Sequence, residues 1–306
     1  MRESREWSVS TDDGVRLHVE QWPAVTADAP LVLGLHGITA NRRGFLPLVE
    51  ELAGEVEFVA YDARGRGSSD KPVDATSYGH RRHAEDAAAV LRSLGRPADV
   101  LVGQSMGAWD GLQLAAHHPD LVTALVLGDG GYFSDLPEGV SAEAHVDSIM
   151  GPGWVERLTA AVPSRAILFA ALQQVPPFRD SWSPALEAMF DAGLEELPDG
   201  SVRNRCSPVG ARFDSTDYFT PRSAPYVRTD LAQVSCPVHL VRAPRGFDIS
   251  PETQEPLLPE SAVEEFQRAL PQLVVETVPD TNHYTVNFGR AGVVALAEAV
   301  RKGCQQ

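Results

Sequence analysis

The rest of the chain is interpreted from one stretch, Leu101-Val102-Gly103-Gln104-Ser105-Met106-Gly107-Ala108-Trp109. The apolar run 99–102 predicts a buried parallel strand, and the composition of 108–118 predicts a helix. A Gly-x-Ser-x-Gly turn joins the two. Glycines suit this turn because larger side chains would collide with the neighbouring strand and helix. We therefore expect Ser105 at the apex of a sharp turn, at the carboxyl edge of a sheet and above the N-terminus of a helix.

Length and composition limit the class of protein. The chain has 306 residues, of which 43% are hydrophobic and 22% charged, which suits one large α/β domain or a domain with an insertion. A net charge of −16 gives no long-range attraction for nucleic acid or an anionic membrane. Three scattered cysteines predict free thiols in a reducing compartment rather than disulfides or a zinc site. Without an apolar leader or a membrane-length apolar run, the chain is expected to be cytoplasmic.

Apolar runs alternate with helical patterns along much of the chain. Strands are predicted at 31–35, 56–61, 121–127, 236–241 and 273–278. An opening hairpin is predicted around Asp12-Asp13-Gly14, where polar and apolar residues alternate on both sides of an Asp-Gly turn. Helices are predicted at 78–94 and 292–302. Strands that alternate with helices in this way predict a mostly parallel sheet with helices on both faces.

The segment 132–234 interrupts this alternation. It has helix-like pieces separated by prolines, and it is rich in aromatic residues and methionine. We predict that it forms a helical cap on a core domain made of 1–131 and 235–306. Aromatic residues that line a cavity beneath such a cap would favour an apolar or aromatic ligand. No pattern in the sequence indicates the oligomeric state.

Four motifs occur in an order that characterises one family. They are His36-Gly37 after an early strand, Asp62-x-Arg64-Gly65-x-Gly67-x-Ser69, the turn at Ser105, and Asn282-His283 near the end. On these motifs the chain resembles the α/β-hydrolase superfamily, in its capped branch with a serine nucleophile. The resemblance implies the α/β-hydrolase fold, with a mostly parallel eight-stranded sheet flanked by helices, and a Ser–acid–His triad without a cofactor or metal. It does not imply a substrate, because this fold supports many chemistries.

The resemblance assigns roles around Ser105. Serine needs a base to accept its proton, and His283 follows the last strand, where the family places that base. The backbone N–H groups of Met106 and Ile38 are the expected oxyanion hole. The residues expected to contact the substrate are His36, Gly37, Trp109, Phe133, Trp154 and Tyr284.

Two aspartates compete for the role of triad acid. Most of the family places the acid after the strand that ends here near Val241, and Asp248 lies in that loop, two residues later than expected. Other members place it after the preceding strand, where Asp129 is flanked by small glycines that allow a close approach to the histidine. Asp129 is slightly favoured, and both stay candidates at this point.

Other polar residues have a structural and a functional interpretation. Asp62, Arg64 and Arg66 are compatible with a clamp for a substrate carboxylate, but the glycines among them favour a structural network in a tight turn. His80 and His83 are expected on a helix surface, and no histidine pair has convincing metal-binding spacing.

We therefore predict a cofactor-independent hydrolase that cleaves an ester, lactone or thioester of a small apolar or aromatic molecule through an acyl-Ser105 intermediate. The alternatives are a carbon–carbon bond hydrolase, or a cyclase, condensation enzyme or lyase that acts on natural products in the same pocket. A member that only binds its ligand is the third alternative. Neither a nucleic acid nor a membrane is an expected partner.

Overall fold

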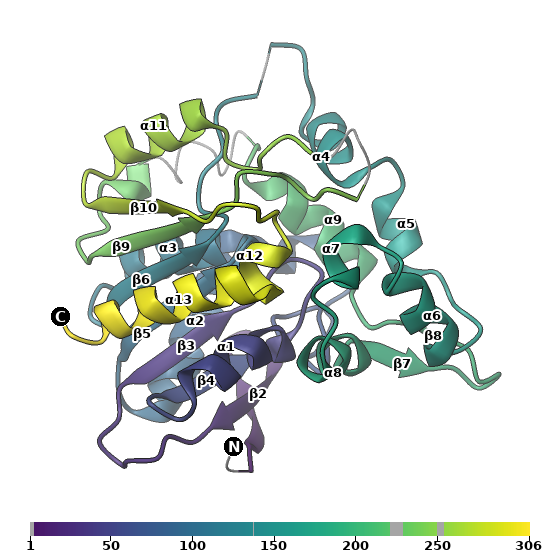
Figure 1. Cartoon of the computed structure of the whole chain (residues 1–306), viewed down its shortest axis with the longest axis horizontal. Coiled ribbons are helices and arrows are strands. Elements are labelled where there is room, and N and C mark those ends of the chain that lie inside the picture. The colour runs from purple at the N-terminus through teal and green to yellow at the C-terminus, as the bar shows by residue number, and fades with distance from the viewer. Residues whose placement is uncertain (1–2, 137, 221–228, 250–253) are drawn as a thin grey trace.

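The computed structural model of the chain describes residues 3–136, 138–220, 229–249 and 254–306, and an eight-stranded sheet lies at its centre (Figure 1). The strands are β1 (Arg5–Ser10), β2 (Arg16–Trp22), β3 (Leu31–Leu35), β4 (Glu57–Tyr61), β5 (Ala98–Gln104), β6 (Val122–Gly128), β9 (Val238–Arg242) and β10 (Leu273–Thr277). Their order in the sheet is β1-β2-β4-β3-β5-β6-β9-β10. All pairs from β4 to β10 are parallel, whereas β1–β2 and β2–β4 are antiparallel. The predicted α/β-hydrolase fold with a mostly parallel eight-stranded sheet is confirmed.

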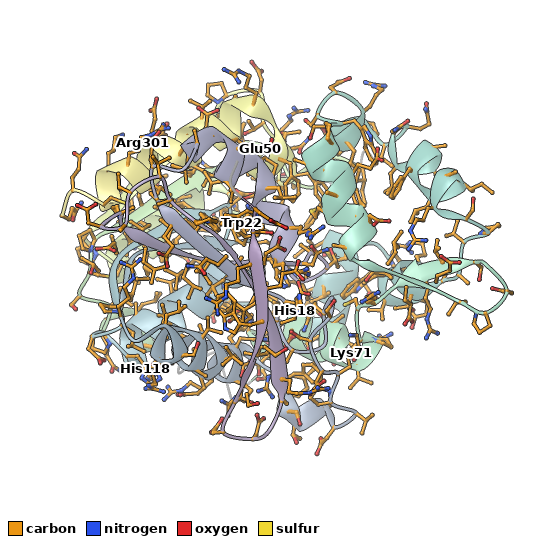
Figure 2. All side chains as sticks on the ribbon, turned by 90° about the horizontal axis from the view of Figure 1, so that it is seen from below. His18, Trp22, Glu50, Lys71, His118 and Arg301 are labelled. Carbon is orange, nitrogen blue, oxygen red and sulfur yellow. The ribbon has the colours of Figure 1, made fainter. Side chains whose placement is uncertain are left out.

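The opening hairpin forms where the Asp-Gly turn predicted it. Gly14 adopts a φ of 83°, and the backbone N–H of Thr11 donates to the carbonyl of Val15 across the turn. Figure 2 shows β2 with His18 and Trp22 along it, seen from below the view of Figure 1. The hairpin extends the sheet at its β4 edge.

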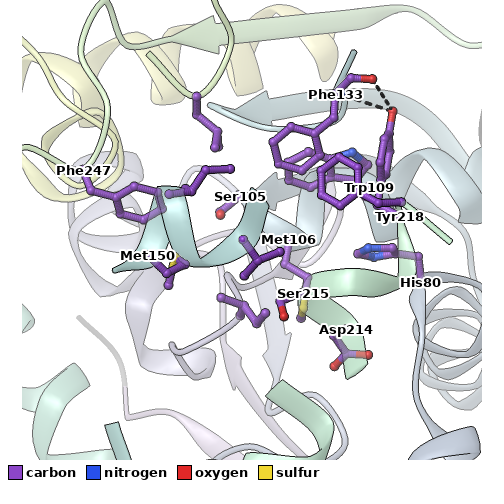
Figure 3. Close-up of a pocket in the computed structure, with 15 residues that line it drawn as sticks. His80, Ser105, Met106, Trp109, Phe133, Met150, Asp214, Ser215, Tyr218 and Phe247 are labelled. Atoms are coloured by element: carbon purple, nitrogen blue, oxygen red, sulfur yellow. Dashed lines mark hydrogen bonds between the residues drawn. The ribbon is translucent and has the colours of Figure 1, made fainter. Parts of the chain in front are cut away.

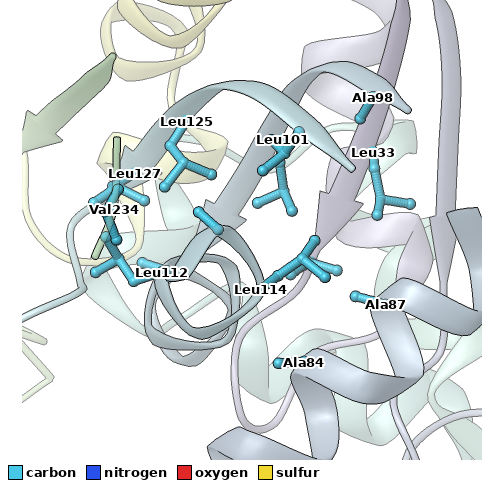
Figure 4. Close-up of a cluster of buried hydrophobic side chains, with 14 of the residues drawn as sticks. Leu33, Ala84, Ala87, Ala98, Leu101, Leu112, Leu114, Leu125, Leu127 and Val234 are labelled. Carbon is cyan, nitrogen blue, oxygen red and sulfur yellow. The ribbon is translucent and has the colours of Figure 1, made fainter. Parts of the chain in front are cut away.

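Helices pack against both faces of the sheet. One apolar cluster joins strand residues to α2 (His80–Leu94), α3 (Met106–His117) and α11 (Glu260–Ala269). A second cluster joins the sheet to α1 (Leu46–Leu52) and α13 (Arg290–Gly303). The short helices η1 (Arg42–Phe45), η2 (Ala75–Ser77) and α12 (Thr285–Phe288) complete this part of the chain. Figure 4 shows Leu101 and Leu125 of the sheet facing Leu112 and Leu114 of α3. This packing fixes α3, and therefore the turn before it, at the edge of the sheet.

The chain between β6 and β9, here called the inserted segment, is mostly helical. It contains α4 (Ala142–Met150), α5 (Trp154–Thr159), α6 (Arg165–Leu172), α7 (Pro176–Arg179), α8 (Pro184–Ala192) and α9 (Pro208–Asp217), with a small hairpin of β7 (Leu194–Glu196) and β8 (Val202–Asn204). Its helices stand at one end of the sheet (Figure 1). None of the described helices is long and apolar enough to cross a membrane.

Candidate active site

Ser105 occupies a strained turn between β5 and α3. Its backbone has a φ of 52° and a ψ of −117°, a conformation that non-glycine residues rarely adopt. The turn is fixed because its N–H donates to the carbonyl of Gly128 at 2.9 Å. A methyl group on Gly103 would lie 2.3 Å from the carbonyl oxygen of Gly107, and one on Gly107 would lie 2.0 Å from that of Leu35. Both glycines of the Gly-x-Ser-x-Gly pattern are therefore required by close backbone contacts.

A chain of two hydrogen bonds links Ser105 to a histidine and an aspartate. His283 Nε2 lies 3.0 Å from Ser105 Oγ, and His283 Nδ1 lies 2.8 Å from Asp129 Oδ2. The backbone of His283 is held at both ends: its N–H donates to the carbonyl of Gly246, and its carbonyl accepts from Asn287 Nδ2 at 3.0 Å. Asp129 is fully buried, and His283 is 5% exposed. The arrangement allows the histidine to accept the Ser105 proton while the carboxylate holds the opposite ring nitrogen.

The structure distinguishes the two candidate acids. The second oxygen of Asp129 accepts a hydrogen bond of 2.9 Å from the backbone N–H of Ala243, so that the carboxylate is fixed on both sides. The carboxylate of Asp248 instead pairs with Arg245 Nη1 at 2.6 Å and accepts from Gln254 Nε2 at 3.2 Å. Because these groups hold its carboxylate, Asp248 is not the partner of His283. Of the two candidate acids, Asp129 is the one bonded to His283.

The two expected oxyanion donors lie beside Ser105. Met106 is the first residue of α3, so its N–H has no acceptor within the helix. A methyl group on Gly37 would lie only 3.3 Å from Ser105 Cβ, which places the loop that carries Ile38 against the serine. Arg66 Nε donates to the carbonyl of Ile38 at 3.0 Å and holds this loop in place.

His36, one of the residues expected to contact substrate, lines neither of the two cavities beside Ser105. Its Nδ1 bonds to the carbonyl of Gly37 at 2.8 Å, and its Nε2 accepts the N–H of Ala63 at 2.9 Å. Burial lowers the pKa of His36 to about 4, so the ring is neutral at pH 7. The side chain therefore shapes the loop that contains Gly37 and Ile38.

Trp154, also expected to contact substrate, lies within the inserted segment. It is 7% exposed and packs in an apolar cluster with Val146, Val155 and Ala211. The ring lines neither cavity at Ser105. It stabilises the packing of α4, α5 and α9 within the inserted segment.

Among the cavities formed by the described residues, two are lined by Ser105. The first, the aromatic pocket, has a volume of about 70 Å³ and is lined by Trp109, Phe133, Tyr218 and Phe219, among others. The rings of Trp109 and Phe133 stack with their centroids 4.6 Å apart, and Tyr218 Oη donates to the carbonyl of Phe133 at 3.2 Å (Figure 3). The core and the inserted segment therefore build this pocket together. Trp109 and Phe133, both expected to contact substrate, lie where such contact is possible.

The second cavity, the amide pocket, has a volume of about 240 Å³. Its polar lining includes the side-chain amides Asn41, Gln104, Asn204 and Asn287. Gly37 and Tyr284, also expected to contact substrate, line it as well, and burial raises the pKa of Tyr284 to about 12. Since Ser105 and His283 both line this pocket, it opens directly on the reactive groups.

A network of buried charges lies beside the aromatic pocket, and sequence reasoning missed it. Asp214 of α9 pairs with Arg66 and with His83 Nε2, the latter at 2.9 Å. His80 Nδ1 lies 2.8 Å from Asp110. Burial alone lowers the pKa of both histidines, but the neighbouring carboxylates outweigh it and raise the pKa of each. For Asp214, burial is outweighed by His83 and Arg66, and its pKa is lowered.

The surface placement expected for His80 and His83 is therefore wrong, since they are 5% and 1% exposed. Figure 3 shows His80 beside Trp109 and Tyr218, and Asp214 near Ser215. The carboxylate bonded to His80 lies 30 residues away in the sequence, and the one bonded to His83 lies 131 residues away. No local sequence pattern therefore marks these pairs.

The cluster in the motif around Gly65 is structural. Asp62 pairs with Arg42 Nη1 at 3.0 Å, and Arg64 Nη2 pairs with Asp86 at 2.7 Å. Asp62, Arg64 and Arg66 are fully buried and line neither cavity at Ser105. They form the turn network rather than a clamp for a substrate carboxylate.

Comparison with known proteins gives matches over most of the chain. A profile described as alpha/beta hydrolase fold matches residues 30–289. A 2-(acetamidomethylene)succinate hydrolase from Mesorhizobium japonicum is 30% identical over 265 residues, which cover 83% of this chain and 82% of that protein. The crystal structure of an E-2-(acetamidomethylene)succinate hydrolase superposes with a TM-score of 0.78 at 25% identity, covering 99% of this chain and 100% of the other. A thioesterase domain from the curacin biosynthetic pathway shares the fold, with a TM-score of 0.76 at 19% identity over 98% of this chain and 100% of that domain.

Proposed function

Because the chain belongs to the α/β-hydrolase fold family and is a hydrolase, we propose that it cleaves an ester, lactone or thioester through an acyl intermediate on Ser105. The observation that carries this proposal is the pair of hydrogen bonds from Ser105 Oγ to His283 at 3.0 Å and from His283 to Asp129 at 2.8 Å. Serine is a weak nucleophile unless a base accepts its proton, and this geometry supplies that base.

In the first half of the reaction, Ser105 Oγ attacks the carbonyl carbon of the substrate. His283 Nε2 accepts the hydroxyl proton and then donates it to the leaving alcohol or thiol. Asp129 holds the Nδ1–H and stabilises the imidazolium that forms. The N–H groups of Met106 and Ile38 stabilise the oxyanion, and the loss of one such donor typically slows a reaction about 10²- to 10³-fold.

In the second half, water takes the place of the leaving group. His283 accepts a proton from the water, whose oxygen attacks the acyl carbon, and Ser105 recovers its proton as the acid departs. The inserted segment acts as a cap, since Phe133 and Tyr218 of that segment line the aromatic pocket at Ser105. An apolar or aromatic part of the substrate occupies that pocket, which excludes water from one side of the reacting bond.

The substrate named for the 30% identical relative is not assigned to this chain. A succinate carries two carboxylates, and such groups are ordinarily bound by Arg or Lys. Among the residues that the structure describes, no Arg or Lys lines either pocket at Ser105, while Asp214 lines the aromatic pocket. Since Asp214 is already paired with Arg66, it is the lack of Arg and Lys among the described lining residues that favours a neutral substrate.

A second candidate function is hydrolysis of a carbon–carbon bond in a diketone, or a cyclase, condensation or lyase reaction of a natural product. The stacked rings of Trp109 and Phe133 favour it, since they accommodate a bulky unsaturated group. An ester hydrolase turns over short p-nitrophenyl esters, whereas a carbon–carbon hydrolase prefers diketones to them.

The test of the proposed function is covalent labelling by a fluorophosphonate, followed by intact-protein mass spectrometry. The wild-type protein is expected to gain one adduct on Ser105, and Ser105→Ala and His283→Ala are expected to gain none. An unlabelled but folded wild-type protein contradicts an activated serine. A protein that is stabilised by ligand yet neither labels nor turns over substrate is a binding member of the family.

A further inference from the structure

Gln104 is a buried polar side chain for which the proposed mechanism has no use. It immediately precedes Ser105, it is 2% exposed, and it lines the amide pocket. Neither its Oε1 nor its Nε2 has a hydrogen-bond partner among the described residues. Buried amides are nearly always hydrogen-bonded, and exceptions concentrate at functional sites.

The neighbours of Gln104 explain why its amide is not satisfied within the protein. A methyl group on Gly44 would lie 3.7 Å from Gln104 Oε1, 3.4 Å from Met189 Sδ and 3.8 Å from Phe288. The amide therefore borders a cavity whose nearby wall is largely apolar. The adjacent Asn41 is already committed, because its Nδ2 donates to the carbonyl of Met189 at 2.8 Å.

Asn287 differs from Gln104 although it lines the same pocket. Its Nδ2 donates to the carbonyl of His283, and its Oδ1 lies 2.4 Å from the position that a methyl group on Gly128 would occupy. The amide of Asn287 is thus turned toward the backbone that holds the catalytic loop. The Oδ1 of Asn287 also lacks a hydrogen-bond partner, but among the described amides that line this pocket it is Gln104 in which both the buried donor and the buried acceptor are left for a ligand.

The charges around the amide pocket restrict the ligand further. Among the described residues, no Asp, Glu, Lys or Arg lines the pocket, and its titratable groups are His283 and Tyr284. A charged ligand group would lose its hydration without gaining an opposite charge. A neutral group that both accepts and donates hydrogen bonds matches Gln104 best.

We propose that the amide pocket is a substrate subsite, and that Gln104 selects substrates that carry a neutral carboxamide beside the scissile ester or thioester. A carboxamide offers one carbonyl and one N–H group, and these pair with Nε2 and Oε1 of Gln104. The apolar part of the substrate occupies the aromatic pocket on the other side of Ser105. This proposal rests on the proposed function and specifies its substrate class.

The experiment compares esters that differ in a single group. Two matched pairs are made, one with a terminal carboxamide or its isopropyl isostere on the alcohol, and one with the same two groups on the acyl chain. In the wild-type protein we expect kcat/KM for a carboxamide ester to exceed that of its isostere about 10- to 100-fold in at least one pair, as one or two neutral hydrogen bonds provide.

Two variants remove the amide of Gln104 while keeping its bulk, Gln104→Leu and Gln104→Met. Either variant is expected to abolish the preference, because it slows the carboxamide ester far more than the isopropyl ester. The control is Gln113→Leu, which removes another buried glutamine, 5% exposed on α3, that lines neither pocket. Gln113→Leu should keep the preference for the carboxamide ester. Because the methionine side chain is unbranched like that of glutamine, Gln104→Met still provides the test if Gln104→Leu does not fold.

Fluorophosphonate labelling separates this proposal from the proposed function. A wild-type protein that labels at Ser105 but shows no carboxamide preference overturns the role of Gln104 and leaves the serine mechanism intact. A preference that survives in both Gln104 variants also overturns it. A wild-type protein that does not label overturns the proposed function itself.

Discussion

His283 and His83, in two regions of the molecule, are both buried and bonded to a carboxylate, but they differ in the partner of the second ring nitrogen. At the sheet edge, His283 lies 2.8 Å from Asp129, and its other nitrogen lies 3.0 Å from the hydroxyl of Ser105. Beneath α9, His83 lies 2.9 Å from Asp214, and its Nδ1 is buried without a partner among the described residues. The contact between histidine and carboxylate is thus nearly the same in both regions, but of these two histidines only His283 has a hydrogen bond to a hydroxyl among the described residues.

Charge separates the two regions as well. Asp214 also pairs with the fully buried Arg66, and the pKa of His83 is raised mainly because the carboxylates of Asp214 and Asp110 outweigh its burial. Asp214 forms a buried ion pair with Arg66, and its bond to His83 joins α9 of the inserted segment to α2 of the core. In this molecule a histidine–carboxylate pair is placed for catalysis where a hydroxyl reaches its free nitrogen. Otherwise the same pair serves cohesion.

The largest expected effect comes from removing the hydroxyl that distinguishes the first region. Ser105→Ala is expected to lower kcat about 10⁶-fold, the scale known for loss of such a nucleophile. The measurement is steady-state turnover of the best ester, with a fluorophosphonate adduct as the second readout. Activity within tenfold of the wild type would falsify the serine mechanism.

The next effect concerns the carboxylate of the first region. Asp129→Asn is expected to lower kcat about 10⁴-fold, because an amide cannot hold His283 in the required tautomer. The matched control is Asp248→Asn, which should stay within a few-fold of the wild type because that carboxylate pairs with Arg245. Turnover of the same ester by both variants gives the answer. Equal losses in the two variants would refute the assignment of Asp129.

The first region was largely predictable from the sequence, and its remaining ambiguity has a physical origin. The apolar runs and their alternation with helical patterns predicted the strands, and the glycines around Ser105 predicted the turn. Asp129 and Asp248 both follow strands of the sheet, and both adopt a left-handed backbone, with φ of 50° and 55°. Only the position of each carboxylate in space separates them, and in a folded chain that position is set by contacts such as the one from Ala243 to Asp129.

The second region escaped prediction because its pairs form between distant segments. The helical pattern of α2 says that one of its faces is buried, but it does not say that Asp214 of the inserted segment will cover His83 on that face. Gln104 escaped for a related reason. Its importance lies in the absence of a partner among the described residues, and a sequence shows which polar groups exist but not which remain unsatisfied after folding.

The third expected effect is on stability, and it tests the second region. Asp214→Asn leaves the buried charge of Arg66 without its counter-charge and weakens the contact with His83, so the free energy of unfolding should fall by about 3–5 kcal/mol. Urea denaturation at pH 7 measures this change. Asp129→Asn is the matched control and should lose less than half as much. If the two variants were equally unstable, the division into a catalytic and a cohesive pair would be wrong.

The smallest expected effect tests a third kind of buried histidine, which has no carboxylate bonded to it. Burial lowers the pKa of His36 to about 4, below its value of 6.5 in the unfolded chain, and its Nε2 must stay unprotonated to accept the N–H of Ala63. The unfolded chain therefore binds a proton more readily. Stability is lost as the pH falls from 6.5 toward 4, by up to about 3 kcal/mol for a shift of this size.

The raised pKa values of His80 and His83 act in the opposite direction, because their stabilisation is complete below pH 6.5 and is lost as the pH rises. The lowered pKa of Asp214 acts only near and below the ordinary carboxylate range. Burial also lowers the pKa values of His145 and His239, which act in the same direction as that of His36, so the contribution of His36 is measured as the difference between the wild type and a variant. In His36→Gln, whose amide oxygen still accepts the N–H of Ala63, the decline in unfolding free energy from pH 6.5 to about 4.5 should flatten. A decline as steep as in the wild type would show that another group is responsible.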